Sequence, residues 1–213
     1  GAAPTGLTFN ADGSYSFDAA SYDSLATGAT QVITIPYTAT DANNASNSAN
    51  LVITITGSND GPIASAASNA VNEDATISGS VSATDADLGE TATLVYTLNG
   101  AAPTGLTFNA DGSYSFDASS YDSLVKDATQ VLTIPYTATD AQGVASTANL
   151  VITITGTNDV PVASAASNAV NEDAVVTGSV SATDADQASG LVYSLNGAAP
   201  TGLTFNADGS YSF

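Results

Sequence analysis

The chain has 213 residues, of which 43% are hydrophobic, so it carries enough apolar material for packed cores. It has 21 acidic residues and one basic residue, Lys126, and the formal net charge of -20 excludes nucleic acid and anionic membrane surfaces as partners. No apolar run could span a membrane, and the lack of Cys excludes disulfides, so we expect calcium to be the cross-link of a secreted, extracellular protein.

The sequence repeats itself with the length of a β-sandwich domain, about 100 residues. The segment GAAPTGLTFNADGSYSF begins at Gly1, Gly100 and Gly197, at intervals of 99 and 97 residues. We expect three units, called beads one, two and three: the C-terminal portion of one repeat (1–60), a complete repeat (61–159) and the N-terminal portion of a third (160–213). This framing indicates an excerpt from a longer array, with any export signal outside it.

Bead two contains short runs in which apolar residues alternate with small or polar ones, as in half-buried strands. In chain order, the predicted strands are 77–83, 94–98, 106–108, 114–116, 131–138 and 150–155. Between the third and fourth, Asn109-Ala-Asp111-Gly112 predicts a hairpin turn, with Gly where a positive φ is needed. Pro135 has no backbone donor, so we expect an edge strand or a bulge there.

About seven short strands with regular turn signals predict an all-β fold, with one antiparallel Greek-key β-sandwich per bead. The period-2 alternation predicts these core residues: Tyr96, Leu98, Phe108, Tyr114, Phe116, Ile152 and Ile154. Bead three is two residues shorter than bead two after its Asp184-Ala-Asp186 triplet, and this difference in length predicts a surface loop.

The acidic residues of bead two concentrate in loops and at strand ends, which a sandwich brings to its two poles. Asp85-Ala-Asp87 places two carboxylates on one side of an extended segment, an arrangement that suits a cation needing about six to eight oxygen ligands. Because no basic residue lies nearby to pair with them, calcium explains Asp85, Asp87 and Asp159 better than a set of solvated turns does. Asp111 and Asp117 are explained by a hairpin turn and a strand end.

Four motifs, taken in order, resemble the VCBS repeats of giant bacterial adhesins secreted by type I (RTX-type) systems, and also the order of cadherin motifs. They are Val71-Asn-Glu-Asp-Ala75, Val81-Ser-Ala-Thr-Asp-Ala-Asp87, Tyr136-Thr-Ala-Thr-Asp140 and Val151-Ile-Thr-Ile-Thr-Gly-Thr-Asn-Asp159-Val-Pro161. The resemblance covers the whole chain. It implies tandem Ig-like, cadherin-like sandwiches with calcium between successive beads.

The resemblance also implies which residues hold the calcium. For the junction between beads one and two it implies Asp23, Asn59, Asp60, Asp85, Asp87 and Asp140. For the junction between beads two and three it implies Glu73, Asp122, Asn158, Asp159, Asp184 and Asp186. We expect one to three ions per junction, with the site of Asn158, Asp184 and Asp186 as the main one.

The chain departs from the cadherin pattern at three places. Tyr121-Asp-Ser-Leu124 stands where cadherins have an acidic LDRE segment, so one Glu ligand is missing. Gly156 lies where the linker motif opens with Asp, and Val160 where it closes with Asn. These losses weaken the site nearest the preceding bead.

We expect the chain to be a structural extender of a bacterial adhesin or of a surface or biofilm filament, with neighbouring repeats of the same chain as its first partners. Lateral contacts with other copies, or with cell-surface or matrix partners, stay open. An enzyme is not expected, because the sequence has no His or Cys and identical acidic clusters in each bead serve no catalytic purpose. The alternative is an adhesion module that binds a sugar or a protein through Tyr15, Tyr114 and Tyr211, although alternation with Phe places these tyrosines in strand packing.

Overall fold

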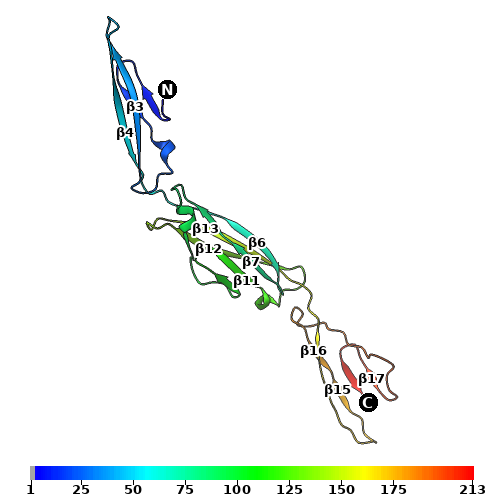
Figure 1. Cartoon of the computed structure of the whole chain (residues 1–213). Coiled ribbons are helices and arrows are strands. Elements are labelled where there is room, and N and C mark those ends of the chain that lie inside the picture. The colour runs from blue at the N-terminus through cyan, green and yellow to red at the C-terminus, as the bar shows by residue number, and fades with distance from the viewer. Residues whose placement is uncertain (1–2) are drawn as a thin grey trace.

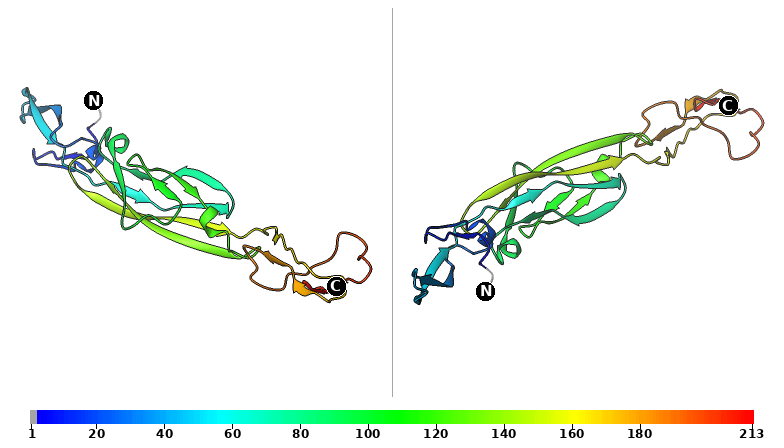
Figure 2. Two further views of the ribbon diagram at one scale, coloured as in Figure 1. Left: turned by 90° about the horizontal axis from the view of Figure 1, so that it is seen from below. Right: turned by 90° about the horizontal axis from the view of Figure 1, so that it is seen from above.

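The computed structural model describes residues 3–213 and shows the three beads arranged end to end as an elongated rod (Figures 1 and 2). Strand pairing takes place within each bead and never between beads in this described part of the chain. Residues 3–213 contain β-strands and three short 3-10 turns, with no α-helix. None of these elements is a helix long and apolar enough to cross a membrane.

Bead two is a complete sandwich built from nine strand segments. They are β5 (Ile63–Ser65), β6 (Ala67–Asn72), β7 (Thr76–Ser80), β8 (Ser82–Thr84), β9 (Val95–Leu98), β10 (Leu106–Phe108), β11 (Ser113–Asp117), β12 (Thr129–Thr139) and β13 (Ala145–Thr155). Two 3-10 turns accompany them, η2 (Glu90–Thr93) and η3 (Ser119–Tyr121). The all-β prediction is confirmed.

Two sheets form the layers of bead two. One has the strand order β6-β13-β12-β9 and the other β10-β11-β7, while β5 and β8 form a separate pair at one end. The β12–β13 hairpin is the frame of the first sheet, with antiparallel pairing from Thr129↔Thr155 to Thr139↔Ala145. β6 pairs with β13 in parallel, from Ala67↔Leu150 to Asn72↔Thr155, so this sheet is mixed rather than purely antiparallel as the sequence predicted.

The core lies between these sheets and follows the predicted alternation. Of the seven predicted core residues, five are buried: Tyr96, Tyr114, Phe116, Ile152 and Ile154. Leu98 and Phe108 are partly buried and pack against them. The hydroxyl of Tyr136 connects this core to the β5–β8 pair, because it donates to the carbonyl oxygens of Ser65 and Ser82.

Two details of the predicted strands differ from the structure. The strand predicted at 77–83 is broken at Val81, because β7 pairs with β11 whereas β8 pairs with β5. Pro135 lies in β12, an inner strand and not an edge strand. It is tolerated there because the pairing of β12 with β9 runs only over Tyr136–Thr139, so the missing N–H falls beyond the neighbouring strand.

Beads one and three contain only part of this sandwich. Bead one contains β1 (Leu7–Phe9), β2 (Tyr15–Phe17), η1 (Ala20–Tyr22), β3 (Thr30–Thr40) and β4 (Ser46–Thr56). Bead three contains β14 (Val162–Ser164), β15 (Thr177–Ser179), β16 (Ser181–Thr183), β17 (Thr204–Phe205) and β18 (Ser210–Ser212). Tyr37 in bead one is 39% exposed whereas its equivalent Tyr136 is 0% exposed, because residues 3–60 contain no counterparts of β5 to β9 to cover it.

Candidate metal centres at the bead junctions

The first junction brings together residues from the linker and from two loops at one pole of bead two, one after β8 and one after β12. The Asn59 side-chain amide donates to Oδ2 of Asp140 at 2.8 Å, across 81 residues of sequence. The backbone N–H of Asp60 donates to Oδ2 of Asp87 at 3.0 Å, and the N–H of Asp87 donates to Oδ1 of Asp85 at 3.0 Å. Five of the six residues predicted for this junction are therefore connected by direct hydrogen bonds.

Two carboxylates of this junction are incompletely satisfied. Asp87 is 1% exposed, and its Oδ1 is buried without a hydrogen-bond partner. Oδ2 of Asp85 is likewise buried and unpartnered. A buried carboxylate oxygen without a hydrogen-bond donor carries a large desolvation penalty. A positive charge or a further donor beside these two side chains would remove that penalty.

The sixth predicted residue, Asp23 of bead one, takes part through its charge. Partial burial, followed by the charges of Asp23, Asp87 and Asp85, raises the pKa of Asp60 above its ordinary value of 3.8. Asp140 differs, because the Asn59 amide and backbone N–H groups hold the pKa of its carboxyl below 3.8. Negative charge thus accumulates around Asp60. Asp140, in contrast, is ionised and held in place by its hydrogen bonds, so its oxygens are suited to bind a metal ion.

The structure adds a carboxylate that motif reasoning missed. Asp85, Glu90 and Asp140 each place one carboxylate oxygen within 4.8 Å of those of the other two. Glu90 lies in η2, outside the four motifs, and the fold of this loop returns it to the junction. The shorter loop of bead three, which has no acidic residue between Asp186 and Asp208, was the sequence signal that could have identified it.

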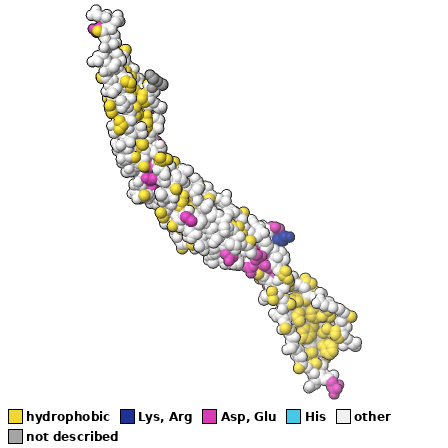
Figure 3. Space-filling model, viewed as in Figure 1, with side chains coloured by type: hydrophobic (Ala, Val, Ile, Leu, Met, Phe, Trp, Pro, Cys, Tyr) yellow, Lys and Arg dark blue, Asp and Glu magenta, His cyan; other side chains and the backbone are white. Residues whose placement is uncertain are grey.

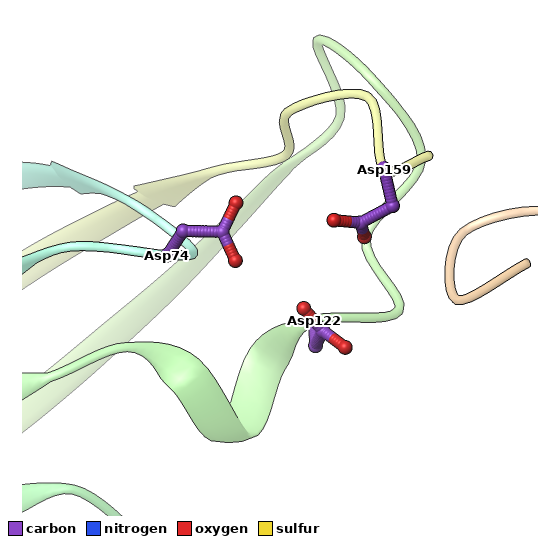
Figure 4. Close-up of side chains that lie close together, drawn as sticks. All are labelled: Asp74, Asp122 and Asp159. Atoms are coloured by element: carbon purple, nitrogen blue, oxygen red, sulfur yellow. The ribbon is translucent and has the colours of Figure 1, made fainter. Parts of the chain in front are cut away.

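The second junction has its own group of three carboxylates, which face a common space in Figure 4. Asp74 follows β6, Asp122 follows η3 and Asp159 follows β13, and one oxygen from each lies within 4.8 Å of the other two. Asp74 was not among the predicted ligands. Partial burial, and then the charges of Asp122, Asp74 and Glu73, raise the pKa of Asp159 above 3.8.

Bead three contributes Asp184 and Asp186 to this junction. The N–H of Asp159 donates to Oδ2 of Asp186 at 3.4 Å, the same contact that links Asp60 to Asp87 at the first junction. Interaction with Asp186 is the largest cause that raises the pKa of Asp184 above 3.8. The Asn158 amide donates to the carbonyl oxygen of Asp159 at 2.7 Å.

Glu73 sits beside this group and anchors the surrounding backbone. It is 0% exposed, its Oε1 accepts the N–H of Thr157 at 2.6 Å, and its Oε2 accepts the N–H of Leu124 at 3.1 Å. The Thr157 hydroxyl donates to Asp74 at 2.9 Å. Glu73 thus fixes the start of the linker and the loop that carries Asp122, so its position is set by the fold.

Asp111 and Asp117 lie apart from both junctions. Oδ1 of Asp111 accepts the N–H and the hydroxyl of Ser113 at 2.9 and 2.6 Å, and these bonds hold the pKa of Asp111 below 3.8. Asp117 accepts the N–H of Ser119 at 3.0 Å. Both carboxylates serve their own turns, in agreement with the sequence prediction.

The donor sets at the two junctions fit a hard divalent cation. Within residues 3–213, the buried side-chain atoms that lack a hydrogen-bond partner are carboxylate oxygens of Asp85, Asp87, Glu90, Asp159 and Asp184, and all five belong to the junctions. Lys126 is the only basic side chain of the sequence, so cations must come from solution. Figure 3 shows acidic side chains gathered where beads two and three meet. Clustered oxygens of this kind are the ligands that calcium prefers.

Residues 59–156 match the family model of the bacterial cadherin-like domain. The match covers the middle bead, which is therefore similar to bacterial cadherin-like domains. The search of curated proteins finds no match.

Solved cadherin structures share the fold. The chain aligns with human CDH23 EC21-23 at a TM-score of 0.59 and 18% identity, covering 97% of the chain and 70% of that structure. Mouse Cadherin-23 EC22-24 gives a TM-score of 0.51 and 21% identity, with coverages of 98% and 71%. The chain spans 54% of the four-domain structure of Protocadherin Gamma B7, which it matches at a TM-score of 0.48 and 20% identity over 97% of its own length.

Proposed function

We propose that this chain is part of the extender of a secreted bacterial surface adhesin of the VCBS type, in which calcium at each junction holds successive beads in line. The main support is that, within residues 3–213, every buried side-chain oxygen without a hydrogen-bond partner belongs to a carboxylate at one of the two junctions. Such groups are tolerated when a cation satisfies them.

The arrangement of the ligands supports a role in stiffening. At the first junction they come from the linker, from the loop after β8 and from the loop after β12, with Asp23 on the preceding bead. A bound calcium ion would supply the positive charge that these side chains lack. Because the carboxylates belong to both beads and to the linker between them, satisfying them together restricts the hinge.

Two of the three tyrosines that would favour a ligand-binding face are used in packing, whereas Tyr15 of bead one is 52% exposed. Tyr114 is 5% exposed, and its hydroxyl accepts a hydrogen bond from the Asn69 amide at 3.1 Å. In bead three, Tyr211 accepts the corresponding bond from Asn168 at 3.5 Å. The extender is therefore better supported than a sugar-binding or protein-binding module.

The test is small-angle scattering of the 213-residue chain in millimolar calcium and then in chelator, together with a calorimetric calcium titration. We expect bound calcium, a maximum dimension close to that of the straight rod, and a broader, more flexible distribution after chelation. The absence of bound calcium, or an identical scattering curve in both buffers, would exclude the calcium-held extender.

A further inference from the structure

Glu90 is held at the first junction by a loop that folds back on Asp85. Gly89, at φ +90, turns the chain into η2, and the N–H of Glu90 donates to the carbonyl of Asp87 at 3.1 Å. The Thr91 hydroxyl accepts the N–H of Asp85 at 2.8 Å and lies 3.2 Å from the Asp85 carbonyl oxygen. This short loop therefore fixes the Glu90 side chain on the same pole as Asp85.

The Glu90 carboxylate completes a group of oxygens with no cation among them. One of its oxygens lies within 4.8 Å of an oxygen of Asp85 and of Asp140. Its Oε2 is buried without a partner, as is Oδ2 of Asp85. Asp140 is 6% exposed and is anchored by Asn59 and by backbone donors. Three carboxylates at this spacing repel one another unless a cation lies between them.

A second observation from the same junction points to a ligand. Asp87 is almost fully buried, one of its oxygens is used by Asp60, and the other has no partner. The backbone N–H of Asp87 donates to Oδ1 of Asp85, so the two residues lie side by side at the same pole of bead two.

We infer that Glu90 is a further calcium ligand of the first junction, acting with Asp85 and Asp140, and that it raises the calcium affinity of this junction above what the motif residues alone provide. The inference rests on the proposed function. Calcium affinity rises with the number of charged ligands at a site, so an added carboxylate strengthens binding.

Bead three lacks the equivalent ligand. Its loop continues from Asp186 with Gln187-Ala-Ser-Gly190, two residues shorter than 88–93 and without a carboxylate. The two loops therefore differ in charge although the Asp-Ala-Asp triplets before them are identical. This loop therefore gives the first junction a carboxylate that the bead-three loop does not supply to the second.

Glu90 is also connected to the preceding bead. The Gln142 amide donates to Oε1 of Glu90 at 2.9 Å and reaches the hydroxyl of Thr27, in bead one, at 3.5 Å. The N–H of Leu88, two residues before Glu90, donates to the carbonyl of Ser24 in bead one at 3.1 Å. Fixing Glu90 on an ion therefore also fixes the loop that touches bead one.

The test compares calcium binding by the 213-residue chain and by Glu90→Gln, using isothermal titration calorimetry. We expect Glu90→Gln to lose one ion, or to bind one class of ions at least about tenfold more weakly. A second variant, with residues 88–93 replaced by the Gln-Ala-Ser-Gly of bead three, is expected to show the same loss. The matched control is Asp127→Asn, which removes one charge at a left-handed position (φ 67) that Asn accepts, and it should bind calcium as the parent does.

Thermal unfolding in chelator checks that each variant is folded, and we expect an unchanged or raised midpoint for Glu90→Gln because it removes a repelling charge. Parent-like stoichiometry and affinity in a folded Glu90→Gln would overturn the inference while leaving the proposed function intact. If the parent itself bound no calcium, the proposed function would fail as well, so the two failures are distinguishable.

Discussion

The backbone N–H of Asp60 donates to Oδ2 of Asp87 at 3.0 Å, so the linker is bound to bead two by a carboxylate whose other oxygen is buried and free. The same relationship recurs between Asp159 and Asp186 at the next junction, at 3.4 Å. One carboxylate thus holds the linker backbone with one oxygen and leaves the other without a hydrogen-bond donor.

The substitution Asp87→Asn separates these two roles. It keeps the shape and the acceptor for Asp60 but removes a buried charge, so we expect an unchanged or raised thermal midpoint in chelator. In calcium we expect the stabilisation by the ion to be much reduced, with affinity lower by about tenfold or more. Circular dichroism melts in both buffers measure the two effects. An equal calcium-induced shift in parent and variant would contradict the assignment.

For the turn carboxylate Asp111 we expect the opposite of Asp87: its substitution should change stability, and the change should not depend on calcium. Its pKa is lowered in the folded state by the Ser113 hydroxyl and N–H, so its contribution to stability is present above pH 3.8 and is lost as the pH falls through its folded pKa. Asp111→Asn should lower the midpoint of bead two at neutral pH, equally with calcium and with chelator, and flatten the acid limb of the pH–stability curve. A calcium-dependent effect would place Asp111 at a metal site instead.

The junction carboxylates predict a pH-dependent hinge in the absence of calcium. The pKa values of Asp60, Asp159 and Asp184 are raised, so their ionisation disfavours the closed junction as the pH rises from 3.8 through the folded values. In chelator, scattering should show a straighter, less flexible rod just above pH 3.8 than at neutral pH. In millimolar calcium the difference should shrink. A rod that is equally flexible at both pH values in chelator would refute this coupling.

The role of the Tyr136 hydroxyl can be tested with an internal control. Tyr136→Phe removes from a fully buried side chain the hydroxyl that the part-buried carbonyls of Ser65 and Ser82 share as donor, which should cost about 1–3 kcal/mol of unfolding free energy. The matched change Tyr37→Phe removes the same hydroxyl from bead one, where the side chain is 39% exposed, and should have little effect. Urea unfolding followed by circular dichroism measures both. Equal losses would show that the hydroxyl acts in some other way.

Local pattern predicted much of the fold. The turn containing Asp111 and the alternating strands around it are short-range features, and the structure contains them with the expected core side chains. The parallel pairing of β6 with β13 joins residues about 80 positions apart, and nothing local to either strand specifies it. The break at Val81 likewise depends on which strands lie on either side.

The junction residues also fall into two groups, those that the sequence motifs predicted and those that only the three-dimensional fold brings to the junction. Asp60, Asp85 and Asp87 lie in recognisable motifs and the structure connects them. Glu90 and Asp74 were missed because their position depends on how a loop and a strand end fold in three dimensions. Whether any of these residues binds calcium stays a prediction, and the titrations above decide it.

The parallel pairing of β6 with β13 has a mechanical consequence. The chain enters bead two through β5 and β6 and leaves it through β13, so a force applied to the two ends of the chain would pull these neighbouring strands in opposite directions. Because the two strands are parallel, the load shears all six paired positions together instead of peeling them apart one at a time. Rupture under force follows the unfolding rate, and simultaneous shear keeps that rate low. The pairing at the edge of the first sheet is therefore the one that pulling on the chain loads directly.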